Sequence, residues 1–141
     1  MAVDNRFIGL QYPLVKTPRG ILAQKKGVAQ IKADMLQLLL TTPGERVMLP
    51  EFGTPLKELF FEPNDPILVN RARQMIAKSL AQWEPRVVIE NVEVSSSIDR
   101  DSLHPDDPQD DREHILSIKI SFVDPEDITE IQELKLEVPV A

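Results

Sequence analysis

Seven acidic residues and His104 gather in one stretch, residues 99–113, and His114 follows it directly. A calcium-binding EF-hand loop would need carboxylates at fixed positions, a glycine at its sixth position and a final bidentate glutamate. In a loop that starts at Asp99, the glycine position holds His104 and the last position holds Asp110. The pattern therefore fails, and a solvated acidic surface loop is the favoured interpretation.

The other catalytic residue types form no recognisable site. His104 in the acidic loop and His114 at its end lack the helical spacing of a metal pair, and the chain has no cysteine. The run of serines at 95–97 lacks a glycine elbow, and no glycine-rich phosphate-binding loop is present. Many carboxylates could form a glycosidase pair, but none is singled out, and aromatic platforms for a sugar are scarce. The sequence therefore predicts no catalytic residue, no metal site and no cofactor.

Length and charge narrow the class of protein further. A chain of 141 residues fits one domain with a real hydrophobic core. Residues 1–60 hold eight Lys/Arg and five Asp/Glu, whereas residues 61–141 hold eight and eighteen. The acidic second half argues against nucleic-acid binding, because contacts with phosphates need clustered cations. There is no signal-peptide pattern and no apolar run near the ~20 residues of a membrane span, so we expect a soluble protein without membrane insertion.

Apolar spacing and turn residues predict the elements of the first half. Residues 1–26 carry prolines and glycines that exclude a long helix, so they are predicted to form an extended arm. A first helix is predicted over 27–40, where a Pro-Gly turn follows it, and a short strand over 45–49. Asp65 and the proline after it suit the start of a second helix, which runs to Trp83.

Three strands are predicted in the second half. Residues 86–95 are rich in Val and Ile, and residues 115–123 and 134–140 alternate apolar and polar side chains. One apolar face per strand indicates an antiparallel sheet that is covered on one side. The predicted fold is therefore α+β, with two main helices packed on one face of a small, mainly antiparallel sheet. We predict a single domain over 27–141, with the acidic loop at 98–113, preceded by the arm.

Three stretches together carry a resemblance to a known family. They are residues 41–53 (TTPGERVMLPEFG), residues 59–65 (LFFEPND) and residues 83–87 (WEPRV). In this order and spacing they resemble the baseplate wedge and sheath-initiator family of contractile phage tails. Members of that family also occur in bacteriocins, extracellular injection systems and type VI secretion. The resemblance covers residues 27–97 well and the final strands in outline, and the arm and acidic loop lie outside it.

The resemblance implies a structural assembly protein rather than an enzyme. Family members lie in the baseplate around the tube in six copies, and they begin sheath polymerisation by β-strand addition at a sheet edge. The implied partners are the sheath protein, the baseplate wedge proteins and tube-proximal or spike-hub proteins. Assembly is expected in the cytoplasm, before incorporation into the particle. The candidate for the edge is the alternating segment of Leu134, Lys135, Leu136, Glu137 and Val138.

The resemblance also implies a contact with wedge proteins at Glu84, Pro85 and Arg86, between the second helix and the strand that follows it. Physically, Pro85 fixes the turn, and the two charged side chains can form charge-assisted hydrogen bonds with a partner. An internal ion pair, such as Arg86 with Glu51 or Glu84 with Arg46, is an equally supported interpretation.

Two other functions stay open from the sequence. The family often carries the label lysozyme-like, so a peptidoglycan hydrolase is the alternative, and the missing acid–nucleophile pair argues against it. A small adaptor protein unrelated to tails is the third. Which contractile system the protein serves also stays open.

Overall fold

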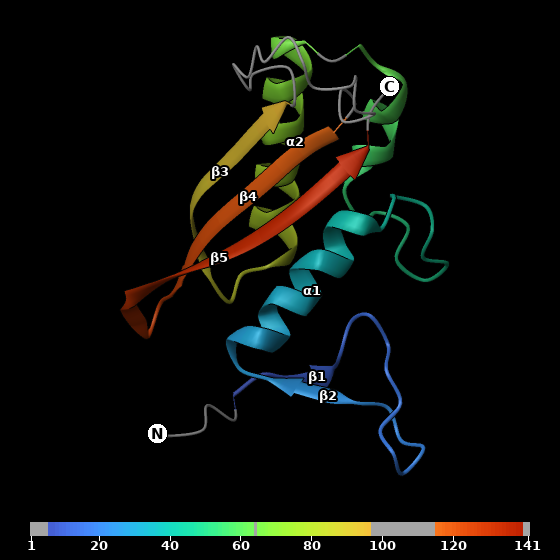
Figure 1. Cartoon of the computed structure of the whole chain (residues 1–141), viewed down its shortest axis with the longest axis vertical. Coiled ribbons are helices and arrows are strands. Elements are labelled where there is room, and N and C mark those ends of the chain that lie inside the picture. Colours follow the sequence, from blue (N-terminus) through green and yellow to red (C-terminus); the bar gives the residue numbers. More distant parts are fainter. Residues whose placement is uncertain (1–5, 64, 97–114, 140–141) are drawn as a thin grey trace, which may run out of the picture.

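The computed structural model describes residues 6–63, 65–96 and 115–139. Figure 1 shows helices α1 (Val28–Leu40) and α2 (Pro66–Trp83) on one side of a three-stranded sheet. A two-stranded hairpin projects from the N-terminal end of this body (Figure 1). The arrangement confirms the predicted α+β fold.

Both predicted helices are present, and their ends follow from local hydrogen bonds. At the end of α1, the Thr41 hydroxyl donates to the Gln37 carbonyl at 2.6 Å. At the start of α2, the Asp65 carboxylate accepts from the Leu68 amide at 2.7 Å, which satisfies one of the unpaired donors of the first turn. Between the helices lies the short 3-10 helix η1 (Pro55–Phe61).

The strand predicted over residues 45–49 is wrong, because this segment is a loop. It is part of the loop of residues 41–54, whose ends are held together by the Thr54 amide, which donates to the Thr41 carbonyl at 2.8 Å. Within it, the Gly44 amide donates to the Pro50 carbonyl at 2.7 Å. The backbone groups that a strand would pair with a neighbour are instead used inside the loop.

The main sheet has the order β3–β4–β5, with antiparallel pairing throughout. Its strands are β3 (Val88–Ser96), β4 (Ile115–Asp124) and β5 (Asp127–Pro139). Strand β5 starts at Asp127, directly after the tight turn that follows β4, rather than at the predicted Leu134. The prediction missed the first half of β5 because its residues do not alternate cleanly between apolar and polar. The pairing leaves β3 and β5 as the edges of the sheet within the described chain.

The core lies between one face of the sheet and the two helices. The central strand contributes Leu116, Ile118, Ile120 and Phe122, each at most 1% exposed, as the alternation predicted. The helices contribute a second set of fully buried side chains, which includes Ile31, Met35, Leu68, Ile76 and Leu80. Among the described helices, none has the length and apolar character needed to cross a membrane.

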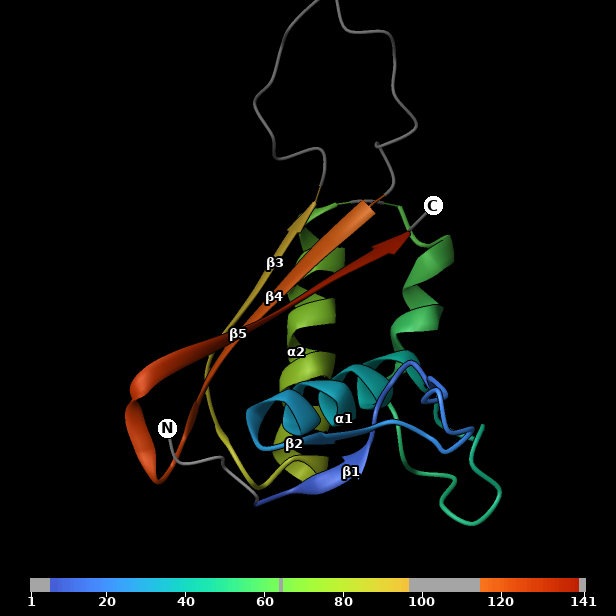
Figure 2. The same ribbon diagram turned by 60° about the horizontal axis from the view of Figure 1, so that its bottom comes forward.

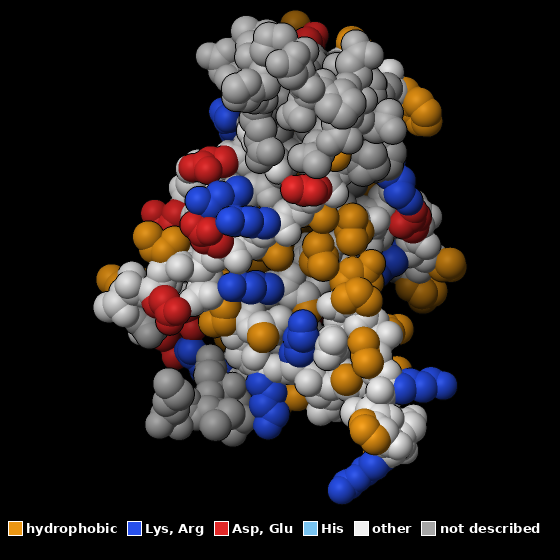
Figure 3. Space-filling model, in the orientation of Figure 1, with side chains coloured by type: hydrophobic (Ala, Val, Ile, Leu, Met, Phe, Trp, Pro, Cys, Tyr) orange, Lys and Arg blue, Asp and Glu red, His pale blue; other side chains and the backbone are white. Residues whose placement is uncertain are grey.

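The N-terminal hairpin pairs β1 (Ile8–Leu10) with β2 (Gln24–Lys26) in an antiparallel register. It lies against the start of α1 (Figure 2), and its far end extends away from the helices and the main sheet in Figure 1. The contact with α1 is close at Gly9, where a Cβ atom would lie 2.5 Å from the Gln30 side chain. Hydrophobic and basic side chains cover the hairpin on the face that Figure 3 shows.

Candidate partner-binding surfaces

The predicted corner at Glu84 and Arg86 forms an internal ion-pair network. Arg86 donates two hydrogen bonds of 2.6 Å each to the Glu84 carboxylate, and its Nη2 also donates to Asp34 of α1 at 2.8 Å. Glu84 caps the end of α2 and its side chain is only 4% exposed. The hydrogen bonds to Glu84 raise the pKa of Arg86, burial opposes this rise, and Asp34 raises it further. The arginine therefore stays charged and ties α1 to the end of α2.

These partners differ from the internal pairs named from the sequence. Arg86 pairs with Glu84 and Asp34 instead of Glu51, and Arg46 stacks over the Phe52 ring at 4.1 Å. Glu84 and Arg86 are only two positions apart, so the local chain turn at Pro85 brings them together. The pairing of Asp34 with Arg86 could not be predicted from the sequence, because Asp34 lies 52 residues earlier in the chain.

Aromatic rings surround the corner and leave a small hollow beside it. Phe52 meets Trp83 edge to face, with ring centroids 5.3 Å apart, and the Arg86 guanidinium lies 5.3 Å from the Phe7 ring centroid. The hollow has a volume of about 220 Å³, and its lining includes Arg46 and Arg86. Because the Arg86 side chain is still 29% exposed, part of its guanidinium remains available to a partner.

The predicted strand-addition segment lies on β5, an edge of the sheet. Leu134, Leu136 and Val138 pair with Ile120, Ile118 and Leu116 of the central strand. Val138 is buried and the two leucines are half-buried, whereas Lys135 and Glu137 are exposed. The sequence thus predicted correctly which side chains face the core. On its other side β5 pairs with no strand of the described chain.

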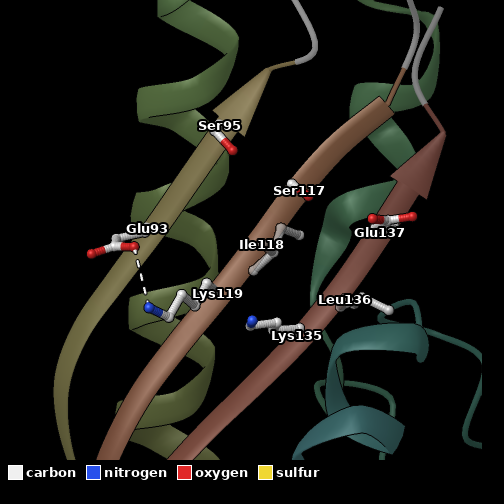
Figure 4. Close-up of a pocket in the computed structure, with 8 residues that line it drawn as sticks. All are labelled: Glu93, Ser95, Ser117, Ile118, Lys119, Lys135, Leu136 and Glu137. Carbon is white, nitrogen blue, oxygen red and sulfur yellow. Dashed lines mark ion pairs between the residues drawn. The ribbon is translucent and has the colours of Figure 1, made fainter. Parts of the chain in front are cut away.

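The exposed face of the sheet carries a ladder of charges (Figure 4). Lys119 of β4 binds Glu133 of β5 at 2.9 Å and lies 4.0 Å from Glu93 of β3. The bond to Glu133 raises the pKa of Lys119 and lowers that of Glu133. A hollow of about 540 Å³ lies over these strands, and Lys135 and Glu137 from the candidate edge line it. The candidate edge is therefore flanked by charged side chains on its solvent face.

The loop of residues 41–54 presents an apolar tip that sequence reasoning missed. Val47 and Met48 are 93% and 92% exposed, although the base of the loop is hydrogen-bonded. Lys57 of η1 binds Glu45 at 2.5 Å beside this tip. The sequence signal for this tip was a run of three apolar residues between a Pro-Gly turn and a proline. The same run is also typical of a short strand, which is why a strand was predicted.

The acidic loop at 98–113, with His104 and most of its carboxylates, lies outside the described residues, as does His114. Within the described ranges, no three His, Cys, Asp or Glu side chains come together in a way that could hold a metal ion.

Comparisons with known proteins agree on one family. The model of the family described as baseplate wedge protein gp25 matches residues 25–123. The baseplate wedge protein gp25 of Enterobacteria phage T4 is 28% identical over 112 residues, which cover 79% of this chain and 76% of that protein.

Two solved structures share the fold. The putative tail lysozyme from Geobacter sulfurreducens has a TM-score of 0.64 and 23% identity, over 84% of this chain and 97% of that one. A chain of the anti-feeding prophage baseplate, 6-fold symmetrised, has a TM-score of 0.60 and 16% identity, over 96% of this chain and 86% of that one.

Proposed function

This chain belongs to the baseplate wedge protein gp25 family, and from that premise we propose that it joins the inner baseplate to the first sheath ring and starts sheath polymerisation by strand addition. Its part in the machine is then that of a structural baseplate component of a contractile tail. The observation that carries the proposal is the open edge of β5.

An edge suits strand addition when it is both rigid and unpaired. The apolar side chains of Leu134, Leu136 and Val138 anchor β5 in the core, so its backbone is already ordered before a partner arrives. An incoming strand would gain main-chain hydrogen bonds at a low entropic cost, and the side chains on the exposed face would set its register. Lys135 and Glu137 also protect the edge from self-association, because charged side chains discourage edge-to-edge pairing.

The corner of Glu84, Pro85 and Arg86 is the proposed contact with the wedge proteins. The internal network leaves part of Arg86 and Asp34 exposed, at 29% and 33% of their side chains. A partner carboxylate could therefore add a hydrogen bond to a guanidinium that is already oriented. We further propose that tube-proximal or spike-hub proteins lie nearby and that six copies surround the tube, in keeping with the 6-fold baseplate that contains a similar chain.

We propose no enzymatic role, although one structural relative is described as a putative tail lysozyme. Two carboxylates of the candidate surfaces are bound to cations, Glu84 to Arg86 and Glu133 to Lys119. A zymogram on peptidoglycan with the purified protein tests this, and a cleared band would contradict it. We also propose that the chain is a single domain over residues 27–141 with an N-terminal arm, and that it is made in the cytoplasm before it enters the particle.

The test of strand addition is Lys135→Pro, which removes a backbone donor from β5. Particles from the producing strain, viewed by negative-stain microscopy, should then show bare tubes or baseplates without sheath. Lys135→Thr, which keeps a strand-forming residue, should give sheathed particles. Thermal unfolding of the two purified variants would establish that both are folded.

A second measurement does not depend on the folding of the proline variant. A photo-crosslinking residue at Glu137, in otherwise unchanged particles, should be joined to the sheath protein. Fully sheathed Lys135→Pro particles, or crosslinks from Glu137 that avoid the sheath protein, would refute strand addition at β5.

A further inference from the structure

The N-terminal hairpin is held in a definite shape by its own backbone hydrogen bonds. Beyond the paired strands, the Gln11 amide donates to the Ala23 carbonyl at 2.9 Å and the Thr17 amide donates to the Ile21 carbonyl at 2.7 Å. The Gly20 amide closes the turn on the Thr17 carbonyl at 2.9 Å. Almost all of this hairpin precedes residue 25, where the match to the family model begins.

The hairpin leaves about half of the surface of its large apolar side chains exposed. Its large apolar side chains and their exposed fractions are Ile8 54%, Leu10 49%, Leu14 63%, Val15 46%, Ile21 65% and Leu22 39%. Near the turn, Ile21 and Leu22 line an open, mainly apolar hollow of about 470 Å³ together with Arg19. A contiguous apolar surface rimmed by polar groups marks an interaction site on a folded protein. A two-stranded hairpin is also marginally stable in water by itself.

The positive charge of the N-terminal segment indicates what kind of surface would cover the hairpin. Residues 1–26 hold five Lys/Arg and one Asp, whereas residues 27–141 hold eleven Lys/Arg and twenty-two Asp/Glu. At the base of the hairpin, Arg6 is bound to Asp124 and Glu126 at the β4–β5 turn, which fixes the hairpin to the body.

Three cations further along the hairpin have no ion pair within the described residues. Lys16, Arg19 and Lys25 make no salt bridge with any described residue. Lys16 directly follows the exposed Val15, and Arg19 lines the hollow together with Ile21 and Leu22, so a partner that covers this surface must offer carboxylates between apolar groups. A nucleic-acid backbone would offer the charge without the apolar cover.

We propose that the hairpin is a docking arm that binds an acidic, partly apolar protein surface on a neighbouring baseplate subunit. The location in the baseplate rests on the proposed function, whereas the chemistry of the partner rests on the hairpin itself. Apolar contacts supply the affinity, and Lys16, Arg19 and Lys25 select an acidic partner and speed its encounter.

The first test reverses the charge of the arm. The triple variant Lys16→Glu, Arg19→Glu and Lys25→Glu should lower the amount of this protein in purified particles, relative to the tube protein, by about tenfold or more, because like charges across an interface weaken binding strongly. The matched control, Lys16→Arg, Arg19→Lys and Lys25→Arg, keeps the charge and should be incorporated normally. Both variants should unfold near the wild-type temperature, since Lys16 and Arg19 are exposed, Lys25 is only partly buried, and none of the three forms a salt bridge with a described residue. Normal incorporation of the charge-reversed variant would overturn the proposal.

The second test identifies the partner. A photo-crosslinking residue at Leu14 or Ile21, in assembled particles, should be joined to an acidic segment of another baseplate protein, located by mass spectrometry. Crosslinks to a second copy of this chain, to a basic protein segment, to nucleic acid or to lipid would each overturn the proposal. The strand-addition proposal fails separately: Lys135→Pro particles should retain this protein and lack sheath, whereas arm variants should lack the protein itself.

Discussion

The two antiparallel β regions of this chain use similar residues in opposite ways. Strands β3, β4 and β5 have 9, 10 and 13 residues, and the central strand β4 buries one face completely. Strands β1 and β2 have three residues each, and the apolar side chains of their hairpin point into solvent. The sheet is therefore stabilised by its own core, whereas the shape of the hairpin depends on its attachment to the body and, by our proposal, on a partner.

The largest difference is expected from truncating one isoleucine in each region. Ile120 is fully buried, so Ile120→Ala should lower the free energy of unfolding by about 2–5 kcal/mol through lost burial and a cavity. Ile21 is 65% exposed, so Ile21→Ala should change it by about 0.5 kcal/mol or less. Urea unfolding of the purified variants measures both. Equal losses would mean that the hairpin is packed as firmly as the sheet.

The corner of Arg86 joins α1 to the end of α2 and contacts Phe7 at the base of the hairpin, and loss of this joint should have the next largest effect. Arg86→Ala removes the only ion pair of Glu84 among the described residues, and Glu84 is 4% exposed. An unpaired, nearly buried carboxylate should cost about 2–3 kcal/mol of unfolding free energy. Because Phe7 packs under the guanidinium, amide hydrogen exchange of residues 8–10 should also become faster.

A matched control separates charge from geometry at this joint. Arg86→Lys keeps the positive charge but cannot hold both Glu84 and Asp34 with a planar fork, so its loss should be intermediate. Unchanged stability in Arg86→Ala would contradict an internal role for the network and leave the partner contact as its purpose.

Two glycines with positive φ give a smaller contrast between body and hairpin. At Gly53 (φ +128°) a Cβ atom would lie 2.4 Å from the Thr41 carbonyl oxygen, so the loop base must shift. At Gly20 (φ +78°) nothing lies within 4 Å, so only the backbone conformation is strained. We expect Gly53→Ala to cost about 2 kcal/mol and Gly20→Ala about 1 kcal/mol of unfolding free energy. Thermal unfolding with both variants tests the order, and the reverse order would contradict it.

How much the sequence could predict depended on whether the signal was local. The alternation of β4 and the cap at Asp65 predicted buried faces and a helix start correctly, because each depends on neighbouring residues. The loop at residues 45–49 was predicted as a strand because its apolar run gives no sign that its backbone bonds stay within the loop. The bond between Asp34 and Arg86 and the exposed hairpin depend on tertiary contacts, which spacing along the chain does not encode.

The smallest predicted effect concerns the charge ladder on the exposed face of the sheet. The hydrogen bond from Lys119 is the main reason that the pKa of Glu133 lies below its ordinary value of 4.5, and Lys135 adds a weaker Coulombic effect. A carboxylate whose pKa is lowered by folding stabilises the native state above its unfolded pKa, and this contribution is lost as pH falls through the folded value. The ladder should therefore matter only above the acid range in which Glu133 takes up a proton.

An NMR titration of the Glu133 carboxyl group measures this directly. Lys119→Ala should raise its pKa toward the ordinary value, and Lys135→Ala should raise it less, because only Lys119 donates a hydrogen bond to it. Both lysines are exposed, so salt should reduce the difference between the wild type and Lys119→Ala. If the two alanine variants raise the pKa of Glu133 equally, the general field of the nearby lysines lowers it, rather than a specific hydrogen bond from Lys119. The sheet would then resemble the hairpin, whose cations Lys16, Arg19 and Lys25 also have no fixed partner among the described residues.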